Sequence, residues 1–330
     1  MTAPVALVAG ASRGLGQVIA GELLDRGYRV AICARGAQEL AAAVSTLRPR
    51  GEVTSHVCDV SQRDQVEALV SSLTAAHGGI DVLITVAGTI QVGPAESMTM
   101  KHFEEAMSTM AWGPVHLAWA VLPQMRARRA GRIGTIASIG GIVAPPHLLP
   151  YATAKFAAVG FSEGLAAELS GTGVTSTTVL PGLMRTGSHE RALFTGQQGR
   201  EYAWFAPSAS LPLISMNAER AAAKIVDGVL AGKPHVALHP MTHLAIRVKG
   251  LAPSTTVRAM GLAGRVLPAS PSPTRSETIE GHQAARSLNS TVVSGLTTLG
   301  SRAARRFGQR IGRRRDGDDP PREGQGPQSN

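Results

Sequence analysis

The chain opens with an apolar run, a glycine-rich turn and a helical pattern, a combination that few folds contain. The apolar run covers residues 4–9, the turn runs from Gly10 to Gly16, and the helical pattern ends near Gly27. Glycines at a strand-to-helix turn let the backbone approach a ligand, and the first N–H groups of the helix attract an anion. This start predicts a parallel α/β sheet with a phosphate-bearing ligand at the turn. A tight turn without a ligand is the alternative.

Strand and helix patterns alternate through the first 240 residues. The expected strands cover residues 4–9, 29–34, 52–58, 80–86, 132–137, 174–180 and 235–238. Such alternation predicts a parallel sheet with helices on both faces and with ligands at the carboxyl ends of the strands. We therefore predict an α/β fold, a single doubly wound domain of the Rossmann type with a seven-stranded parallel sheet.

The net charge of +10 belongs mainly to the C-terminal part of the chain. From residue 241 onward, 14 Lys and Arg residues stand against 6 Asp and Glu residues. After about residue 268 the chain is rich in Ser, Thr, Pro, Gly and Arg and shows weak periodicity, which is typical of disorder. We expect a folded body over residues 1–240, a helical extension over 241–267 and a disordered basic tail over 268–330.

Two C-terminal segments allow more than one interpretation. Residues 244–267 mix apolar and basic side chains, so contact with an anionic membrane surface, closure of a ligand pocket and subunit contact are all open. We favour packing against the folded body over peripheral membrane contact. Residues 302–315 hold seven arginines, which we expect to be solvated. Nonspecific binding of a phosphate-rich partner is the alternative, and no specific nucleic-acid binding is predicted.

Cysteine usage and the N-terminus favour a cytoplasmic protein. Cys33 and Cys58, the only cysteines, both lie in apolar runs that read as strands, so we expect buried free thiols and no disulfide. The first expected strand begins about four residues from the N-terminus, without a basic leader. The sequence contains no run of about 18 apolar residues, so it predicts no membrane span.

The residues around the second strand favour NADP over NAD. Arg35 lies about twenty residues past Gly16, where an acidic residue would hold the ribose diol of NAD and a base suits the 2′-phosphate of NADP. No acidic residue stands at positions 34–36, and Arg13 adds a second cation in the turn. Two solvated surface arginines are the alternative. Asp59, after the third strand, is predicted either to bind an adenine amino group or to help begin the next helix.

Tyr151 and Lys155 form a candidate acid/base pair. Their spacing of four places them one turn apart on one face of a helix. A neighbouring ammonium stabilises a phenolate and lowers the pKa of the phenol. An exposed helix pair without chemistry is the alternative, because chance supplies this spacing often.

Together these residues resemble the main branch of the short-chain dehydrogenase/reductase family. The resemblance rests, in matching order and approximate spacing, on Gly10, Gly14, Gly16, Asp59, Ala87, Gly88, Ser138, Tyr151, Lys155, Pro181, Gly182 and Thr186. It covers residues 4 to about 240. The most specific part is a serine 13 residues before the Tyr-x-x-x-Lys pattern, behind a glycine-rich first turn.

The resemblance implies catalytic roles for three side chains. Tyr151 would protonate a carbonyl oxygen during reduction or take the hydroxyl proton during oxidation. Lys155 would bind the nicotinamide ribose and lower the pKa of Tyr151, and Ser138 would orient the substrate oxygen. The implied cofactor-binding residues are Gly10, Ser12, Arg13, Gly14, Leu15, Gly16, Arg35, Asp59, Val60, Ala87, Gly88, Tyr151, Lys155, Pro181, Gly182 and Thr186. The cofactor supplies the hydride, so no metal is needed.

The implied activity is NADP-dependent hydride transfer between the nicotinamide and a carbonyl or secondary alcohol, in a homo-oligomer. One departure weakens it: Met110 stands where the family usually has a catalytic asparagine, three residues before Gly113. A thioether donates no hydrogen bond and accepts only weakly, so the family's water relay cannot run unchanged through this side chain. A cofactor-binding regulatory or scaffold protein with little or no turnover is the alternative function.

The expected substrate lid covers residues 187–216. Its large apolar side chains are Leu193, Phe194, Tyr202, Trp204, Phe205, Leu211, Leu213 and Met216. This composition favours an apolar carbonyl or alcohol substrate, and inward packing or an oligomer surface is the alternative. His147 and His189 are expected at the surface, with the pocket mouth as the alternative.

Overall fold

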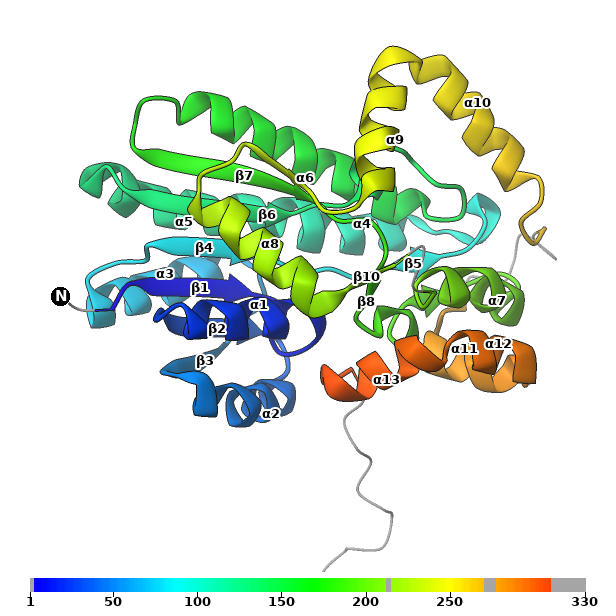
Figure 1. The fold of residues 1–330 in the computed structure, drawn as a ribbon, viewed down its shortest axis with the longest axis horizontal. Helices are drawn as coiled ribbons and strands as arrows, with labels where there is room; N and C mark the ends of the chain where they lie inside the picture. Colours follow the sequence, from blue (N-terminus) through cyan, green and yellow to red (C-terminus); the bar gives the residue numbers. More distant parts are fainter. Residues whose placement is uncertain (1–2, 212–214, 270–276, 310–330) are drawn as a thin grey trace, which may run out of the picture.

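The computed structural model describes residues 3–211, 215–269 and 277–309. Its centre is a seven-stranded parallel sheet between two layers of helices (Figure 1). The strands, in order across the sheet, are β11 (His235–Ala237), β7 (Val174–Leu180), β6 (Gly131–Ile136), β4 (Val82–Thr85), β1 (Val5–Ala9), β2 (Arg29–Ala34) and β3 (Val53–Val57). The predicted α/β fold with seven parallel strands is confirmed.

The central strands of the sheet are buried on both faces, which is why they appear in the sequence as continuous apolar runs. Along β1, Ala6 and Val8 contribute to one core, and Leu7 and Ala9 contribute to the other. Within the first 240 residues, the helices that contribute to the first core are α1 (Gly14–Asp25), α2 (Ala37–Leu47) and α8 (Ala218–Leu230). The helices that contribute to the second core are α3 (Arg63–His77), α5 (Gly113–Arg128) and α6 (Leu149–Glu168).

The strand order reverses between β1 and β4. From β1 the chain continues through β2 to β3 on one side, and from β4 it continues through β6 and β7 to β11 on the other. The loops at the carboxyl ends of β1 and β4 therefore part and open the crevice in which such folds bind ligands. Gly10, at the end of β1, has a φ of 86°, and a side-chain carbon there would lie 2.5 Å from Ala87 N. Glycine is the residue that fits this position.

Short elements complete the body and the lid. Helical elements before the lid are α4 (Met100–Met107), a π-helical turn (Ser108–Trp112) and 3₁₀ turns at Arg48–Arg50, Ala95–Ser97 and Ile139–Gly141. The lid contains a 3₁₀ turn (Ser188–Glu190) and α7 (Gln198–Ser208). Among the described residues, five two-residue strands form two small sheets: β10 (Met216–Asn217) with β8 (Met184–Arg185), and β9 (Leu193–Phe194) between β5 (Gln91–Val92) and β12 (Ile279–Glu280). Strands of two residues show no periodicity, so the sequence does not reveal them.

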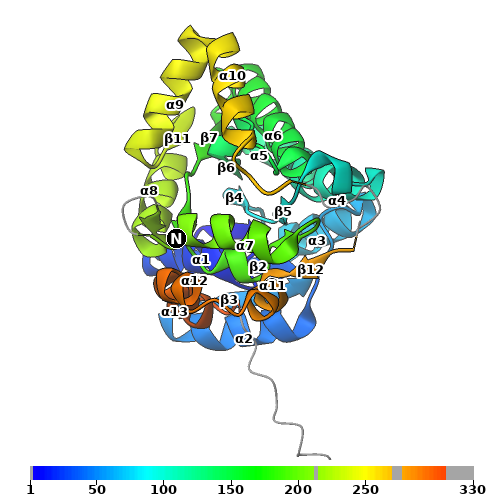
Figure 2. The ribbon, with the colours of Figure 1, turned by 90° about the vertical axis from the view of Figure 1, so that its right-hand side faces the viewer.

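The segment after β11 is helical, as predicted. Helices α9 (Pro240–Leu251) and α10 (Pro253–Gly264) project from the body as a pair (Figures 1 and 2). Their side chains are mostly exposed; Leu251 is 89% exposed, and within the two helices Thr242 and Thr256 are the buried residues. The expected packing against the body therefore holds for a small part of this segment. In the described part of the chain, no helix has both the length and the apolar character needed to cross a bilayer.

Residues 277–309 return to the body, so the predicted disorder from residue 268 is wrong for this part of the chain. After β12 they form α11 (Gly281–Leu288), α12 (Thr291–Leu296) and α13 (Thr298–Arg306). Helices α11 and α12 lie beside α7 (Figure 2). The rest of the predicted tail, residues 270–276 and 310–330, lies outside the described residues.

Small apolar side chains explain why this segment folds despite its polar composition. Ala303 and Phe307 are buried against the first core, and Ala284 is buried against the lid. Alanines on one helix face allow close approach without raising the hydrophobic content of the sequence. Composition therefore predicted disorder where the spacing of a few small residues provides a packed face.

Candidate functional site

The three predicted catalytic side chains meet at the carboxyl end of β6. Ser138 lies two residues past β6, and Tyr151 and Lys155 lie on the first turns of α6. The Ser138 hydroxyl accepts a hydrogen bond from the Gly140 N–H at 3.0 Å, and it lies close enough to the Tyr151 phenol to lower the pKa of that phenol. The Lys155 ammonium lies 5.9 Å from the centre of the Tyr151 ring. Residues separated by up to 17 positions in sequence therefore share one small volume.

Burial dominates the protonation of these side chains. It raises the pKa of Tyr151, and the hydrogen bond with Ser138 opposes part of this effect. It lowers the pKa of Lys155 to about 8. Lys155 Nζ donates to the Ile136 carbonyl at 2.8 Å. The predicted lowering of the Tyr151 pKa by Lys155 is not what the structure shows, because the ammonium bonds to the backbone and desolvation of the phenol is the larger effect.

Met110 forms an apolar wall beside Tyr151. It lies in the π-helical turn and is 1% exposed. Its side chain packs with Ala154 and Tyr151, and its Sδ would lie 3.1 Å from a side-chain carbon at Gly88. The position expected to carry an amide therefore presents a thioether without a hydrogen-bond donor.

The glycine-rich turn joins the ends of β1 and β4 to α1. Gly10 N–H donates to the Cys33 carbonyl at 2.8 Å, and Ala87 N–H donates to the Ala9 carbonyl at 3.1 Å. Gly16 lies so close to the Gly10 carbonyl that no side chain would fit there. Other predicted cofactor residues buried in this region are Ser12, Leu15 and Val60. The turn thus holds the start of α1 at the crevice.

The charged residues predicted to select the cofactor flank this turn. Arg13 lies 3.6 Å from Glu39, and Arg35, whose side chain is 70% exposed, lies 4.0 Å from Asp59. Asp59 Oδ1 accepts hydrogen bonds from the Ser61 N–H at 3.0 Å and from the Ser61 hydroxyl at 2.8 Å. One oxygen of Asp59 therefore shapes the turn before α3, while the other faces Arg35.

The loop after β7 forms the far side of the crevice. The Pro181 carbonyl accepts a hydrogen bond from the Ile139 N–H at 2.8 Å, which ties this loop to the Ser138 loop. A side-chain carbon at Gly182 would lie 3.2 Å from Thr242 Oγ1 on α9. Thr186 is 4% exposed. The predicted cofactor residues of this loop therefore lie opposite the glycine-rich turn.

The aromatic side chains of the lid pack inward. Phe194, Tyr202 and Phe205 are at most 4% exposed, and the Phe194 ring contacts the other two edge-on at 5.6 and 5.9 Å between centres. Tyr151 contacts the same cluster. Inward packing, the alternative interpretation of the lid composition, describes these three residues, and the cluster borders the catalytic phenol. Leu213, also in the predicted set, lies outside the described residues.

A buried polar cluster that the sequence does not indicate holds the lid. His147 Nδ1 lies 2.9 Å from both carboxylate oxygens of Glu201, and Trp204 Nε1 donates to Glu201 at 2.8 Å. The Glu201 side chain is fully buried and that of His147 is 12% exposed. The predicted surface position of His147 is therefore wrong, as is that of His189, which is fully buried. The pattern around Glu201 gives no sign of burial, so only the fold reveals its partners.

A second missed group lies over the glycine-rich turn. Burial lowers the pKa of Arg13, and the nearby Arg191 guanidinium lowers it further. Arg191 Nε donates to the Gln309 carbonyl at 2.9 Å, and the Gly14 N–H donates to the Phe307 carbonyl at 2.7 Å. The end of the described chain therefore contacts the turn at which the sequence predicts a phosphate. Arg13 is the member of this group that the sequence predicted as a cofactor residue, and nothing in the sequence pointed to Arg191, Phe307 or Gln309.

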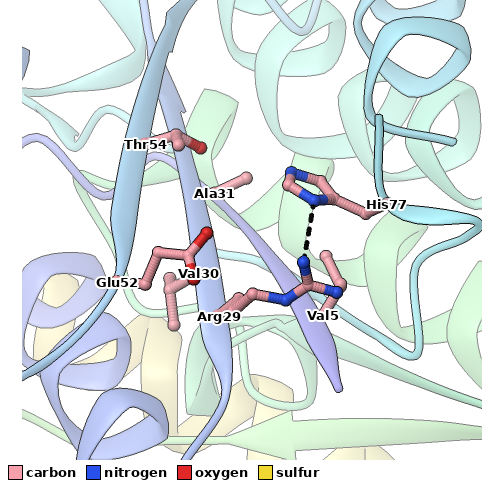
Figure 3. Close-up of a pocket in the computed structure, with 7 residues that line it drawn as sticks. All are labelled: Val5, Arg29, Val30, Ala31, Glu52, Thr54 and His77. Atoms are coloured by element: carbon pink, nitrogen blue, oxygen red, sulfur yellow. Dashed lines mark hydrogen bonds between the residues drawn. The ribbon is translucent and has the colours of Figure 1, made fainter. Parts of the chain in front are cut away.

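A small pocket lies at the opposite end of the sheet. Figure 3 shows its lining residues, which are Val5, Arg29, Val30, Ala31, Glu52, Thr54 and His77. Arg29 Nη1 lies 3.3 Å from His77 Nδ1. The lining belongs mainly to the amino halves of β1, β2 and β3, whereas ligands of such sheets bind at the carboxyl ends, so this pocket is separate from the candidate site. Among the residues that the structure describes, no three His, Cys, Asp or Glu side chains are grouped to hold a metal ion.

The crevice suits a nicotinamide dinucleotide at one end only. At the catalytic end, a side-chain carbon at Gly88 would lie 3.1 Å from Met110 Sδ and 3.9 Å from the Lys155 ammonium, so glycine keeps this strand end free of the side-chain bulk that would crowd a ligand beside Lys155. At the phosphate end, a side-chain carbon on Gly14 would lie 2.5 Å from Gln309 Nε2. The space that glycine leaves at this helix terminus is therefore filled by the chain itself.

The fold is of the Rossmann type, and Ser138, Tyr151 and Lys155 form its candidate site. Residues 4–194, more than half of the chain, match the family described as short chain dehydrogenase. A putative ketoacyl reductase of Streptomyces coelicolor is 37% identical over 185 residues, which are 55% of this chain and 71% of that protein. The D-threitol dehydrogenase of Mycolicibacterium smegmatis is 34% identical over 185 residues, 55% of this chain and 70% of that one.

Solved structures agree with this match. A substituted actinorhodin polyketide ketoreductase with NADPH has a TM-score of 0.64 and 29% identity, over 72% of this chain and 95% of that one. A short-chain dehydrogenase from Streptomyces avermitilis has a TM-score of 0.68 and 28% identity, over 80% and 98%. The chain belongs to the short-chain dehydrogenase family. It is therefore an oxidoreductase of the kind that acts on hydroxyl and carbonyl groups, in a family that binds a nicotinamide cofactor.

Proposed function

We propose that this protein is an NADP-dependent enzyme that interconverts a carbonyl and a secondary alcohol. The observation that carries the proposal is the grouping of the Ser138 hydroxyl, the Tyr151 phenol and the buried Lys155 ammonium in one place. Burying such polar groups costs stability, and shifted pKa values in a crevice are typical of catalytic sites. The position of the group at the carboxyl ends of the strands supports the same role.

The three side chains have distinct tasks in this proposal. Tyr151 gives a proton to the carbonyl oxygen in reduction, and its raised pKa keeps the phenol in the protonated form that this step needs. Ser138 holds the substrate oxygen and stabilises the charge that develops on it. Lys155 binds the cofactor ribose, and its charge stabilises the phenolate after proton transfer. A bound nicotinamide supplies the hydride.

NADP is proposed over NAD because cations flank the glycine-rich turn. Arg13 and Arg35 suit a 2′-phosphate, and positions 34–36 hold no acidic residue. The other proposed cofactor contacts are Gly10, Ser12, Gly14, Leu15, Gly16, Asp59, Val60, Ala87, Gly88, Pro181, Gly182 and Thr186. The similar actinorhodin ketoreductase, whose structure was solved with NADPH, supports the same preference. Equal affinities for NADPH and NADH, measured by titration, would count against it.

An apolar substrate is proposed because apolar side chains border the phenol. Tyr151 packs against Met110 and also against the cluster that contains Phe194 and Phe205. The names of two relatives, a ketoacyl reductase and a polyketide ketoreductase, support a substrate with a carbonyl group on a carbon chain. Apolar ketones and secondary alcohols should therefore be turned over faster than small polyols. A clear preference for the polyols would contradict the proposal.

The test of the catalytic assignment is Tyr151→Phe. We expect NADPH oxidation with a carbonyl panel to fall by about 10²- to 10⁴-fold, because the proton donor is lost, while the variant still binds NADPH. Tyr28→Phe, a partly buried tyrosine in the first core, is the matched control and should keep full turnover. Unchanged turnover in Tyr151→Phe would refute the assignment. NADPH binding by the native protein without turnover on a broad panel would favour a regulatory protein, which Met110 supports.

We also propose a homo-oligomer in the cytoplasm, with a catalytic domain over residues 1–240 and an extension over 241–267. Exposed Trp112, Trp119 and Phe156, from the π-helical turn, α5 and α6, support a subunit contact. Light scattering on the purified protein measures the mass. A monomer at micromolar concentration would contradict the assembly.

A further inference from the structure

The C-terminal end of α13 meets the amino end of α1, where the sequence predicts phosphate binding. The Phe307 carbonyl accepts a hydrogen bond from the Gly14 N–H at 2.7 Å. Phe307 is the C-cap of α13, so its carbonyl is at the end of the helix, where carbonyls lack intrahelical partners. The end of α13 carries partial negative charge, and Gly14 begins the positive end of α1. The negative end of α13 therefore lies at the positive end of α1, where an anion would otherwise bind.

Gln309 fills the space over Gly14. It is 8% exposed, and its Nε2 lies where a side chain at Gly14 would begin. Gly308, with a φ of 68°, ends α13 in the left-handed conformation, and the Gln309 N–H returns to the Ala304 carbonyl at 2.9 Å. A defined helix cap, and not a loose chain end, therefore places these groups at the turn.

The same segment contacts the opposite wall of the crevice. Ala304 packs so closely on Gly187 that no side chain would fit at Gly187. Arg191 Nε donates to the Gln309 carbonyl at 2.9 Å. Gly187 and Arg191 follow directly on the loop proposed to border the cofactor. Residues 303–309, the latch segment, therefore reach from the glycine-rich turn to the lid, the two walls of the proposed phosphate site.

Burial and charge hold the latch segment in place. Ala304 is fully buried, and Ala303 and Phe307 are 9% exposed. Ala303 and Phe307 belong to the first core, and Arg306 pairs with Glu219 on α8. These contacts hold the latch segment against the body, yet they are few enough for a bound ligand to displace the segment.

We propose that the latch segment competes with the phosphates of the dinucleotide for the amino end of α1, so that cofactor binds after this segment leaves. The inference rests on the proposed nicotinamide-dinucleotide function. The latch segment offers a neutral carbonyl and a neutral amide at Gly14, between two guanidiniums. The Arg191 guanidinium lies close enough to lower the pKa of Arg13. Arg13 pairs with Glu39 and Arg191 with Glu280, and a phosphate between the two guanidiniums would add charge-assisted hydrogen bonds. A charged cofactor therefore has an electrostatic advantage over the segment that it replaces.

The size of the effect follows from the fraction of molecules in which the site is open. The apparent dissociation constant equals the intrinsic one divided by the open fraction. A latch segment closed in about 90 to 99% of molecules weakens NADPH binding by about 10- to 100-fold.

A reversible disulfide tests the competition directly. A side-chain carbon at Gly308 would lie 3.6 Å from Arg13 Cβ, within the range of disulfides. In the double variant Arg13→Cys with Gly308→Cys, oxidation should weaken NADPH binding by about tenfold or more relative to the same protein after reduction, measured by fluorescence titration. The two single variants under the same oxidant control for the native cysteines. Equal NADPH affinity in the oxidised and reduced double variant would overturn the proposal.

Opening the latch segment should have the opposite effect. Phe307→Ala combined with Gln309→Gly removes the core contact and the side chain over Gly14, and should tighten NADPH binding by about tenfold. Val293→Ala is the matched control, because it loosens α12 against the lid cluster without touching the glycine-rich turn. No tightening in the double variant, or equal tightening in the control, would argue against the competition.

Hydrogen exchange on the full chain separates competition from a cover that closes over the cofactor. Added NADPH should raise exchange across residues 298–309, whereas a cover would show lowered exchange and contradict the proposal. If no form of the protein binds NADPH or NADH, the proposed function fails, and this inference fails with it. If all forms bind NADPH alike, the competition alone fails.

Discussion

Lys155 is buried at the end of β6 and donates to the Ile136 carbonyl. An ammonium loses hydration there, so its pKa falls to about 8, while the same loss of water raises the pKa of the Tyr151 phenol. As the pH rises, Lys155 therefore loses its proton at a lower pH than Tyr151 does. At the scale of the residue, the site is a protonated acid beside a cation at neutral pH, and it becomes uncharged in mild alkali.

The depressed pKa of Lys155 predicts a pH-dependent stability. The unfolded lysine has a pKa near 10.5, so between pH 8 and 10.5 the unfolded chain binds more protons than the folded one. The free energy of unfolding should therefore rise through this window, by up to about 3 kcal/mol. Urea unfolding of the native protein and of Lys155→Met, at several pH values, isolates this contribution. If the difference in unfolding free energy between the native protein and Lys155→Met did not change with pH, the argument that burial lowers the pKa of Lys155 would be contradicted.

Met110 predicts a stability cost for restoring the family's amide. Met110→Asn places an amide in the space packed against Ala154 and Tyr151, and should lower the free energy of unfolding by about 1–3 kcal/mol. Met110→Leu conserves volume and should cost less than about 1.5 kcal/mol. Turnover per folded molecule should be higher in Met110→Asn than in Met110→Leu, because an amide can hold a water. Lower turnover in the asparagine variant would show that the site works without this relay.

At the scale of the element, α7 is held over the site by a buried carboxylate. Glu201 accepts from Trp204 within α7 and bonds His147 in the loop that leads into α6. This loop also leads to Tyr151. The Glu201 side chain therefore couples the position of the lid to that of the phenol. The cluster of Phe194, Tyr202 and Phe205 then packs on this frame.

Removing the charge of Glu201 should loosen the lid. Glu201→Gln keeps the volume but loses acceptors for two buried donors, so the free energy of unfolding should fall by about 1–3 kcal/mol. Glu163→Gln is the matched control, because Glu163 also lies 2.9 Å from a histidine, His235, but is 44% exposed. The control should change stability by less than about 1 kcal/mol. Calorimetry measures both, and equal losses would mean that burial of Glu201 is unimportant.

At the scale of the whole molecule, the chain returns to its own beginning. Residues 277–309 run past α7, and the latch segment ends at the glycine-rich turn that begins some 300 residues earlier. Cofactor binding is thereby coupled to the contact between the two ends of the described chain. Such a coupling is possible because the segment binds with a few side chains and does not form a strand of the central sheet.

NADPH should therefore stabilise the molecule and expose its end at the same time. At 100 times the dissociation constant, a ligand stabilises the folded state by about 2.7 kcal/mol, less the cost of opening the latch segment. The thermal midpoint should rise, while trypsin cleaves faster after Arg302, Arg305 and Arg306. Cleavage after Arg63, an exposed site on α3, should not change. Slower cleavage at the C-terminal arginines with NADPH would contradict the coupling.

The sequence predicted the seven strands and the group of Ser138, Tyr151 and Lys155 because their signals are local. A buried parallel strand is a short apolar run, and the Tyr-x-x-x-Lys spacing is a property of one helical turn. The strands of the two small sheets are too short to show a hydrophobic periodicity. Residues 277–309 contain too few large apolar side chains for their composition to indicate a fold. Disorder was therefore predicted where a few alanines and Phe307 provide the packed face.

The sequence by itself determined the class of fold, the crevice and the placement of Tyr151 and Lys155 on one helical turn, because turn chemistry and periodicity depend on neighbouring residues. Only the tertiary structure decided how the pair is charged, since desolvation of Lys155 depends on residues from β6 and the crevice around it. It also decided what the glycine-rich turn binds within this chain. The Phe307 carbonyl reaches Gly14 across almost the whole sequence, and no local pattern encodes a contact between a helix end and a helix start so far apart.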